Sequence, residues 1–419
     1  MEATLGKLFG ERERRLKLSS PDPDRRPARC PGSNRQSAQH TAPTETGALR
    51  RTKEGGSTVK AAVLRAYNEP LAIENVRIDE PAPGEVLLKT AASGVCHSDL
   101  HVIDGKLPAP PPLVLGHEPA GIVERVGSDV TYVEPGDHVI ACLSIFCGTC
   151  EYCTTGRPNL CGGAMFDRKP GERPRLEADG TPLYQMAQLG SFAEQMLVPE
   201  NALVKIRDDM PLDRAALIGC GVTTGVGAAL NTARVEPGTT CAVIGCGGVG
   251  LSIIQGCRIA GASRIVAVDT QEWKLELARR LGATEGVNAA DGDPVAQVLE
   301  LTGGGVDYAF EAIGLNPTVR QALAMTRKGG TLLMVGVVAV GEDVEIPGFD
   351  VVINEKKILG SMMGSNAFRV HMPRYVEFYM NGQLRIDEMI SARRPLEEIN
   401  ICFDEMRKGA AARSVIVFD

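Results

Sequence analysis

The 419-residue sequence lacks several features that mark particular classes of protein. No apolar run approaches the roughly 20 residues of a membrane-spanning helix, so no membrane partner is expected. Basic residues are not in excess: 52 acidic and 45 basic side chains give a net charge of −7, which argues against a nucleic-acid partner. Repeats at solenoid spacing are absent as well. What is left is an ordinary globular composition and a chain long enough for two domains.

The first 58 residues have few aliphatic side chains and no period of 2 or 3.6 residues. Such a segment cannot bury enough apolar surface to offset its ordering entropy, so the sequence predicts disorder here, Cys30 included. The segment has no h-region of a secretory signal. Val59, which opens the first expected strand, could be an initiator read from a valine-type start codon. Residues 1–58 would then be an artefact of gene calling, which intact-mass analysis of the native protein would test.

Two patterns divide the rest of the chain. Residues 59–185 alternate short β-like runs with Gly and Pro turns, which predicts a mostly antiparallel β domain. From about residue 215, strands and helices alternate, which predicts a parallel, doubly wound sheet. The last 55 or so residues add two helices and a final strand. The expected fold class is therefore α/β with a second, mostly β domain.

The segment CAVIGCGGVG ends an apolar strand and opens a helix. Gly245, Gly247 and Gly250 have the G-x-G-x-x-G spacing, which permits a tight turn, approach of backbone to a pyrophosphate and close helix–strand packing. Asp269 ends the next strand, 24 residues after Gly245, where it could accept both ribose hydroxyls of NAD and repel the 2′-phosphate of NADP. Lys274 is near enough in sequence to reach the same ribose. The alternative is an ordinary glycine turn with a solvated lysine.

Twelve cysteines are too few, over this length, for a disulfide-dense secreted framework. Four of them lie in CGTCEYCTTGRPNLC, residues 147–161, spaced C-x2-C-x2-C-x7-C. Their clustering indicates metal binding or catalysis, with a redox cluster as the alternative. Cys96, His117 with Glu118, and Cys220 are further candidates, but spacing alone does not show that they converge. A lone buried cysteine is more often part of a core.

GVCHSD, GHEPAGIVERVG, the four-cysteine run, IGCGVTTG and GCGGVG occur in this order and together resemble the zinc-dependent, medium-chain alcohol dehydrogenase family. The resemblance implies NAD as cofactor and two zinc ions per subunit. It also implies a GroES-like, mostly β catalytic domain and a Rossmann domain. The expected boundaries are a disordered extension at 1–58, the first part of the catalytic domain at 59–221, the NAD-binding domain at 222–361 and the C-terminal part of the catalytic domain at 362–419.

The resemblance also assigns roles to single residues. It places the catalytic zinc on Cys96, His117 and Cys220, with the fourth position open for Lewis-acid chemistry. It places a closed structural zinc on the four clustered cysteines: Cys147, Cys150, Cys153 and Cys161. The implied proton relay and its neighbours are Ser98, which takes the alcohol proton, His101 at the outer end, Asp99, which orients His117, and Glu118 behind the zinc. The implied cofactor contacts are Thr224 packing on the nicotinamide, Val249 behind it, His97 and Arg413 at the pyrophosphate, and also Gly245, Gly247, Gly248, Gly250, Asp269, Lys274 and Val337. Without the family, Arg413 would be interpreted as an edge-strand charge, and Ser98 and Asp99 as a helix-cap pair.

An apolar substrate slot is expected from Leu107, Leu143 and Val337, which favours medium-chain, aromatic or branched primary alcohols and their aldehydes. Cys220 as third ligand disfavours sugar alcohols. Leu107 and roughly Met165 stand where the glutathione-dependent formaldehyde branch has an acid and an arginine. This departure disfavours oxidation of S-(hydroxymethyl)glutathione, which is kept as an alternative together with an aldehyde reductase. A zinc-ribbon interaction module is the non-enzymatic alternative.

The resemblance further implies self-association. The segment IPGFDVVINEKKILGSMMG resembles the region through which family members pair their sheets, so a homodimer or homotetramer is expected. The other expected partner is a small-molecule alcohol or aldehyde. The expected location is the cytoplasm.

Overall fold

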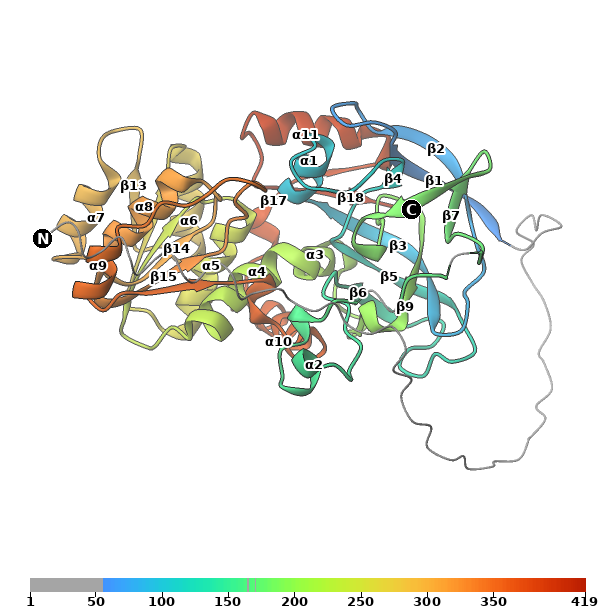
Figure 1. Ribbon diagram of the computed structural model, residues 1–419, viewed down its shortest axis with the longest axis horizontal. Coiled ribbons are helices and arrows are strands. Elements are labelled where there is room, and N and C mark those ends of the chain that lie inside the picture. Colours follow the sequence, from blue (N-terminus) through green and yellow to red (C-terminus); the bar gives the residue numbers. More distant parts are fainter. Residues whose placement is uncertain (1–55, 164–165, 170) are drawn as a thin grey trace, which may run out of the picture. The chain divides into compact units, whose positions relative to one another are not determined.

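A computed structural model describes residues 56–163, 166–169 and 171–419 of the chain (Figure 1). The expected extension up to residue 55, with Cys30, lies outside the described residues, as does Met165 of the expected pocket. The domain boundaries expected from the sequence remain predictions.

The first strand starts earlier than the sequence suggested. β1 (Ser57–Leu64) begins two residues before Val59, because Ser57 pairs with Ile78 of β2 (Ala72–Ile78). The Ser57 hydroxyl also donates to Gln195 Oε1 at 2.9 Å, so the disorder predicted for residues 56–58 is wrong. β1 belongs to a small closed barrel, whose further strands are β4 (Leu113–Val114), β7 (Leu176–Ala178) and β8 (Thr181–Gln185).

A seven-stranded sheet forms the centre of the β-rich half. Its order is β10-β6-β5-β3-β18-β17, with β9 also paired to β3. The strands are β3 (Glu85–Val95), β5 (Pro119–Val126), β6 (His138–Ala141), β9 (Gln195–Pro199), β10 (Leu203–Lys205), β17 (Ile390–Arg394) and β18 (Arg413–Val417). All pairs are antiparallel except β17 with β18. The last strand of the chain thus returns to β3.

A six-stranded parallel sheet, in the order β13-β12-β11-β14-β15-β16, builds the other half. Its strands are β11 (Thr240–Ile244), β12 (Arg264–Asp269), β13 (Glu285–Asn288), β14 (Val306–Glu311), β15 (Thr326–Met334) and β16 (Lys357–Gly360). The helices between them are α5 (Gly248–Ala260), α6 (Glu272–Leu281), α7 (Pro294–Thr302), α8 (Asn316–Met325) and α9 (Gly348–Ile353).

Helices cover both faces of this parallel sheet. Cys241 and Val243 of β11 share a buried cluster with Leu251 of α5, whereas Ala242 and Ile244 share another with residues of α7 and α8. Side chains alternate across a strand, so β11 is buried on both faces. The expected α/β fold, a mostly antiparallel GroES-like half and a doubly wound Rossmann half, is therefore confirmed.

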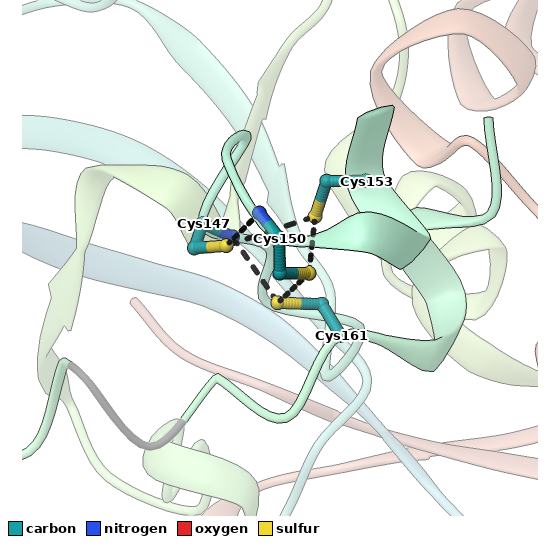
Figure 2. Close-up of side chains that lie close together, drawn as sticks. All are labelled: Cys147, Cys150, Cys153 and Cys161. Carbon is teal, nitrogen blue, oxygen red and sulfur yellow. Dashed lines mark hydrogen bonds between the residues drawn. The ribbon is translucent and has the colours of Figure 1, made fainter. Parts of the chain in front are cut away.

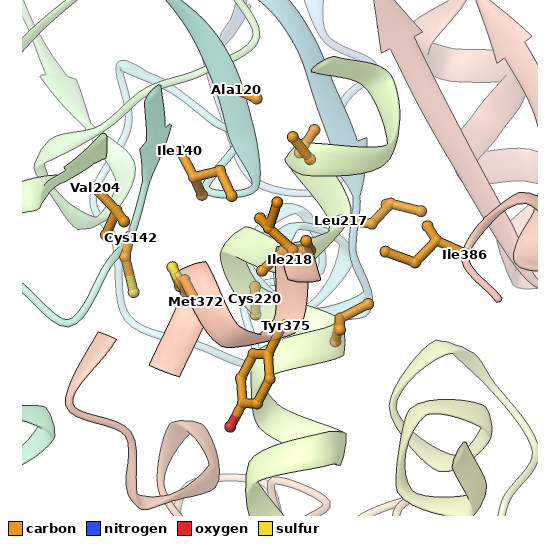
Figure 3. Close-up of a cluster of buried hydrophobic side chains, with 14 of the residues drawn as sticks. Ala120, Ile140, Cys142, Val204, Leu217, Ile218, Cys220, Met372, Tyr375 and Ile386 are labelled. Carbon is orange, nitrogen blue, oxygen red and sulfur yellow. The ribbon is translucent and has the colours of Figure 1, made fainter. Parts of the chain in front are cut away.

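A continuous helical stretch, Leu212–Ala233, precedes the parallel sheet. It comprises α3 (Leu212–Leu217), η5 (Ile218–Val222), α4 (Thr223–Gly227) and η6 (Ala228–Ala233). With 22 residues it is long and apolar enough to cross a membrane by composition, so the expectation that no such run exists is wrong. The stretch is, however, 83% buried inside the protein, packed in the core cluster around Leu217, Ile218 and Cys220 (Figure 3).

The remaining helices are short or follow the Rossmann half. They are α1 (His97–Ile103), α2 (Glu151–Thr154), α10 (Phe368–Met380) and α11 (Ile399–Arg407). α10 packs Met372 and Tyr375 into the same core cluster as Cys220. Five further cysteines are fully buried among core residues: Cys142, Cys241, Cys246, Cys257 and Cys402.

Candidate active site

Cys96 stands at the N-terminus of α1, directly after β3. Asp99, fully buried in the first turn, accepts hydrogen bonds from the backbone N–H of Cys96 at 3.1 Å and of Gly116 at 3.0 Å. Its carboxylate also lies 3.1 Å from His117 Nδ1. Asp99 therefore caps the helix from its third position and holds the His117 ring, whereas Ser98, expected as its cap partner, makes no cap contact among the described residues.

Three residues from distant parts of the chain meet beside Asp99. The ligand atoms of Cys96, His117 and Cys220, with a carboxylate oxygen of Glu118, all lie within 4.8 Å of one another, and all four residues are buried. His117 Nδ1 faces the Asp99 carboxylate, and its other ring nitrogen, the buried Nε2, has no hydrogen-bond partner among the described residues. Two thiols and a free imidazole nitrogen fit a zinc ion with one open position.

The pKa values of the two thiols in this group are shifted in opposite directions. The hydrogen bond with Cys220 and the charge of His117 hold the pKa of the Cys96 thiol well below its usual range. The same hydrogen bond, together with burial, holds the pKa of Cys220 well above it. One sulfur is thus prepared as a thiolate while the other keeps a proton, which a divalent cation would displace on binding.

Glu118 and Arg413 form a buried ion pair behind the thiols. Burial raises the pKa of Glu118 to about 8, against the opposing charge of Arg413. Arg413 is wedged between two glycines: a Cβ on Gly221 would lie 2.9 Å from its Nη1, and one on Gly248 would lie 2.4 Å from its Cδ. Arg413 is therefore no edge-strand charge. Its side chain packs between Gly221, in the helical stretch that carries Cys220, and Gly248, the first residue of α5.

The glycine motif forms the turn between β11 and α5. Gly245 has φ +93°, and a Cβ on Gly250 would lie 1.7 Å from the Gly245 carbonyl oxygen, so both positions require glycine. No atom lies within 4 Å of a Cβ built on Gly247, which leaves space at the helix N-terminus for a pyrophosphate. Asp269 ends β12 and accepts from the N–H of Cys246 at 2.8 Å.

The structure shows fewer contacts for the other residues that are expected to bind the cofactor. Thr224 is 8% exposed, next to the Cys220 turn, and Val249 is partly buried in the α5 cluster. His97 and Val337 are exposed, Val337 by 55%, and Lys274 lies 5.7 Å from the centre of the Trp273 ring.

The expected relay and pocket residues surround the α1 end of the site. Ser98 and His101 are both partly exposed on α1, and burial with the charge of Lys106 lowers the pKa of His101. Leu107 packs against the cluster of Leu100 and other residues of α1, whereas Leu143 packs against the cluster that contains Cys96 and Cys220.

One residue of the site escaped the sequence analysis. The sulfur of Met363 lies 3.9 Å from Cys220 Sγ and accepts a hydrogen bond from the Thr224 hydroxyl at 3.4 Å. No pattern in SMMG distinguishes Met363 from a core methionine, because the contact depends on the backbone of a distant turn.

The four clustered cysteines converge on their own loop, as Figure 2 shows. Their ligand atoms lie within 4.8 Å of one another. Sulfur–sulfur distances are 3.5 Å between Cys150 and Cys153, 3.8 Å between Cys150 and Cys161, and 3.9 Å between Cys147 and Cys153. The Thr149 hydroxyl and the backbone N–H groups of Thr149 and Cys150 donate to Cys147 Sγ, which lowers the pKa of Cys147 to about 5. Four sulfurs around one centre fit a structural zinc ion.

Comparison with known proteins matches both halves. The model of the alcohol dehydrogenase GroES-like domain matches residues 82–208, and that of the zinc-binding dehydrogenase matches residues 248–378. The chain is 40% identical over 375 residues to the class-3 alcohol dehydrogenase of Oryza sativa subsp. japonica, covering 86% of this chain and 97% of that protein. It is also 40% identical over 378 residues to the S-(hydroxymethyl)glutathione dehydrogenase of Saccharomyces cerevisiae, covering 87% and 98%.

Solved structures agree. An alcohol dehydrogenase zinc-binding domain protein from Burkholderia ambifaria superposes with a TM-score of 0.83 at 35% identity. The benzyl alcohol dehydrogenase of Acinetobacter calcoaceticus superposes with a TM-score of 0.81 at 34% identity. Both comparisons cover 87% of this chain and 100% of the other. With its NAD-binding domain and two side-chain groups that could hold zinc, the chain belongs to the zinc-dependent alcohol dehydrogenase family.

Proposed function

We propose that this enzyme transfers hydride reversibly between a primary alcohol group and NAD, with zinc held by Cys96, His117 and Cys220. The observation that carries this is the buried convergence of those three ligand atoms, including the unpartnered Nε2 of His117. A bound zinc ion would supply Lewis acidity that makes a substrate hydroxyl more acidic. The open fourth position is what separates this group from the closed four-cysteine group.

The chain's own residues then handle the proton. Ser98 lies two residues after Cys96 at the start of α1, and His101 lies three residues further, on the same face of that helix. Because its pKa is lowered, His101 is mostly neutral near neutral pH and can accept a proton for release to solvent. Asp99 keeps the His117 ring fixed throughout.

The cofactor is oriented by the Rossmann half. Asp269 is held at the end of β12 by the N–H groups of Cys246 and Gln271, which leaves its negative charge beside the turn where the adenosine ribose belongs. Its charge favours NAD over NADP. Arg413 of β18, whose side chain packs against Gly248, the first residue of α5, is the proposed pyrophosphate contact.

For the substrate, S-(hydroxymethyl)glutathione is the first candidate. The class-3 and S-(hydroxymethyl)glutathione dehydrogenases at about 40% identity support this alternative better than the simple alcohols favoured by the sequence analysis. The adduct is itself a primary alcohol, so its oxidation to a thioester requires no change in the zinc and NAD chemistry described above.

An apolar primary alcohol is the second candidate. Leu107 and Leu143 contribute apolar surface to the clusters around the site, and benzyl alcohol dehydrogenase is among the similar structures. Leu107 offers no charge to bind a glutathione carboxylate, which is the specific observation in favour of this second candidate.

The rate of NADH formation, followed by absorbance, distinguishes the two candidate substrates. Formaldehyde with glutathione, hexanol and benzyl alcohol are compared as substrates, and the reverse reaction is followed with the matching aldehydes. A kcat/KM at least about tenfold higher for the glutathione adduct supports the first candidate. The opposite order establishes the second, and no NADH formation with any of them contradicts the proposed function.

We also propose self-association through the open edge of the parallel sheet. β16 is the edge strand, and α9 beside it in sequence exposes Phe349 by 81%, Val352 by 76% and Ile353 by 64%. Apolar side chains exposed this fully next to a sheet edge favour contact with a second copy. Light scattering should show a dimer or tetramer, and the double variant Phe349→Asp, Val352→Asp should reduce it to a monomer.

A reducing compartment, the cytoplasm, is the proposed location. All eleven cysteines in the described residues are unpaired, and six of them belong to the two candidate metal groups, whose ligands must stay reduced. Cell fractionation of the native organism with an antibody against the protein tests this. Recovery in an extracellular fraction would contradict it.

A further inference from the structure

A short turn after β16 has an unusual backbone. Met363, Gly364 and Ser365 form η7 and have φ values of +51°, +63° and +48°. Left-handed conformations cost free energy for residues other than glycine, so Met363 and Ser365, one on each side of Gly364, require support from their surroundings. The surroundings supply it: Asn231 donates to the Gly364 carbonyl at 3.0 Å, and the Thr232 and Ser365 hydroxyls are 2.8 Å apart.

This turn contacts the helical stretch that carries Cys220 and Thr224. Met363 is 5% exposed, and its sulfur touches the metal ligand Cys220 and the hydroxyl of Thr224, the residue proposed to pack on the nicotinamide. Gly364 is packed against the same helical stretch, because a Cβ on Gly227 would lie 2.5 Å from the Gly364 carbonyl oxygen. A displacement of the turn would therefore move the wall on which the nicotinamide is expected to lie.

The same turn is tied to the four-cysteine loop by one hydrogen bond. Asn159 Nδ2 donates to the Met362 carbonyl at 3.1 Å, across 203 residues of sequence. Asn159 lies in η1 (Pro158–Leu160), which ends directly before Cys161. The segment that positions the Asn159 amide is followed directly by Cys161, a candidate zinc ligand.

From these contacts we infer that Asn159 is a positioning residue, through which the four-cysteine loop holds the turn at Met362–Ser365 and thereby the nicotinamide end of the NAD site. The inference rests on the proposed function. It gives the four-cysteine loop a role in cofactor geometry beyond its own stability. Asn159 donates to the Met362 carbonyl, and the next residue, Met363, contacts Cys220, so Asn159 acts through Met362 and Met363.

The test compares two ligands that differ only at the nicotinamide. Asn159→Asp keeps the side-chain size but replaces the donating amide with an oxygen that repels the Met362 carbonyl. NADH affinity, measured by nucleotide fluorescence, should fall about three- to tenfold, the scale expected for one lost hydrogen bond. ADP-ribose, which has no nicotinamide, should bind as tightly as to the wild type. Asn159→Ala, which adds no charge, should show the same selective loss.

Asn201→Asp is the matched control. Asn201 Nδ2 donates to the Phe146 carbonyl at 2.8 Å, beside Cys147, so it anchors the same loop without reaching the Met362 turn. Its NADH to ADP-ribose affinity ratio should equal that of the wild type, and zinc content should be unchanged in all variants. An unchanged ratio for Asn159→Asp, or an equal change in the control, overturns the inference alone. A wild-type protein that binds neither ligand overturns the proposed function together with it.

Discussion

The two groups of metal-ligating side chains in this enzyme are assembled in opposite ways. The four cysteines come from one segment of fifteen residues, 147–161, and all are partly exposed. Cys96, His117 and Cys220 span 125 residues of sequence, and all are buried. A local loop can surround a metal on all sides, whereas ligands on three separate elements can leave one side for substrate. Closeness in sequence therefore marks the structural site and distance marks the catalytic one.

Removing a catalytic ligand should show the largest effect on activity. Cys96→Ser is expected to lower kcat/KM at least about a thousandfold, because the Lewis acid is lost, while most of the fold is retained. Zinc analysis should fall from two ions to one per subunit, with NADH formation followed in parallel. Cys142→Ser, at a buried cysteine of the same core cluster that is no candidate ligand, is the control. Equal losses of activity and zinc in Cys96→Ser and Cys142→Ser would show that Cys96 has no special role as a metal ligand.

A change in the four-cysteine group should act on the fold first. Cys150→Ser is expected to lower the melting temperature by about 5 °C or more and to reduce soluble yield, because metal binding to such a loop contributes to folding free energy. Thermal unfolding and zinc content are measured together. Unchanged melting temperature and zinc content would show that the four cysteines hold no structural zinc.

Asp99 supports the catalytic group alone, so it tests whether that group depends on its orientation. Asp99→Asn removes the charge that faces His117 Nδ1 and should lower zinc affinity or kcat about 10- to 100-fold. The control is Asp104→Asn at the C-terminal end of the same helix, where Asp104 pairs with Arg407 at 2.7 Å. Zinc competition with a chelator should separate the two variants.

The smallest expected effect concerns the segment that follows Cys161. Arg168 and Arg175 bind Glu85 of β3 at 2.6 and 2.7 Å, which anchors this segment to the sheet. Burial alone would raise the pKa of Glu85, but the hydrogen bond from Arg168 and the charge of Arg175 outweigh it and lower the pKa. A lowered pKa stabilises the fold above the ordinary value of 4.5, and this contribution is lost as the pH falls below it.

Glu85→Gln should therefore unfold at a melting temperature lower by a few degrees near neutral pH, with a smaller further loss at about pH 4 than the wild type. Glu177→Gln, which removes a half-exposed partner of Arg77, is the control and should change little. Parallel pH profiles for the wild type and Glu85→Gln would show that this anchor does not titrate.

Much of the fold followed from local pattern. The glycine turn before α5, the alternation of strands and helices after it, and the convergence of the four cysteines all depend on residues close in sequence. The start of β1 was placed two residues late, because Ser57 is ordered by Ile78 and Gln195, which the local pattern does not contain. The membrane-length helix was missed for a different, local reason: Asp213 and Arg214 interrupt its apolar run near the start.

The residues of the candidate active site could be predicted less well from local sequence patterns. Cys96, His117 and Cys220 were identified through resemblance to a family, and neither periodicity nor spacing would have joined them. Met363 has no signal in the sequence at all, since its contact with Cys220 depends on a left-handed turn supported by other elements.

The sequence by itself determined two local features, the glycine turn for a dinucleotide and the loop of four cysteines. Turn geometry and a short loop leave few alternative conformations for such segments. Only the tertiary structure decided where Cys96, His117 and Cys220 meet, why Arg413 is buried against Glu118, and how Asn159 reaches Met362. Such contacts arise from the packing of β3, the Cys220 helix and β18, whose relative placement is set by burial over the whole chain.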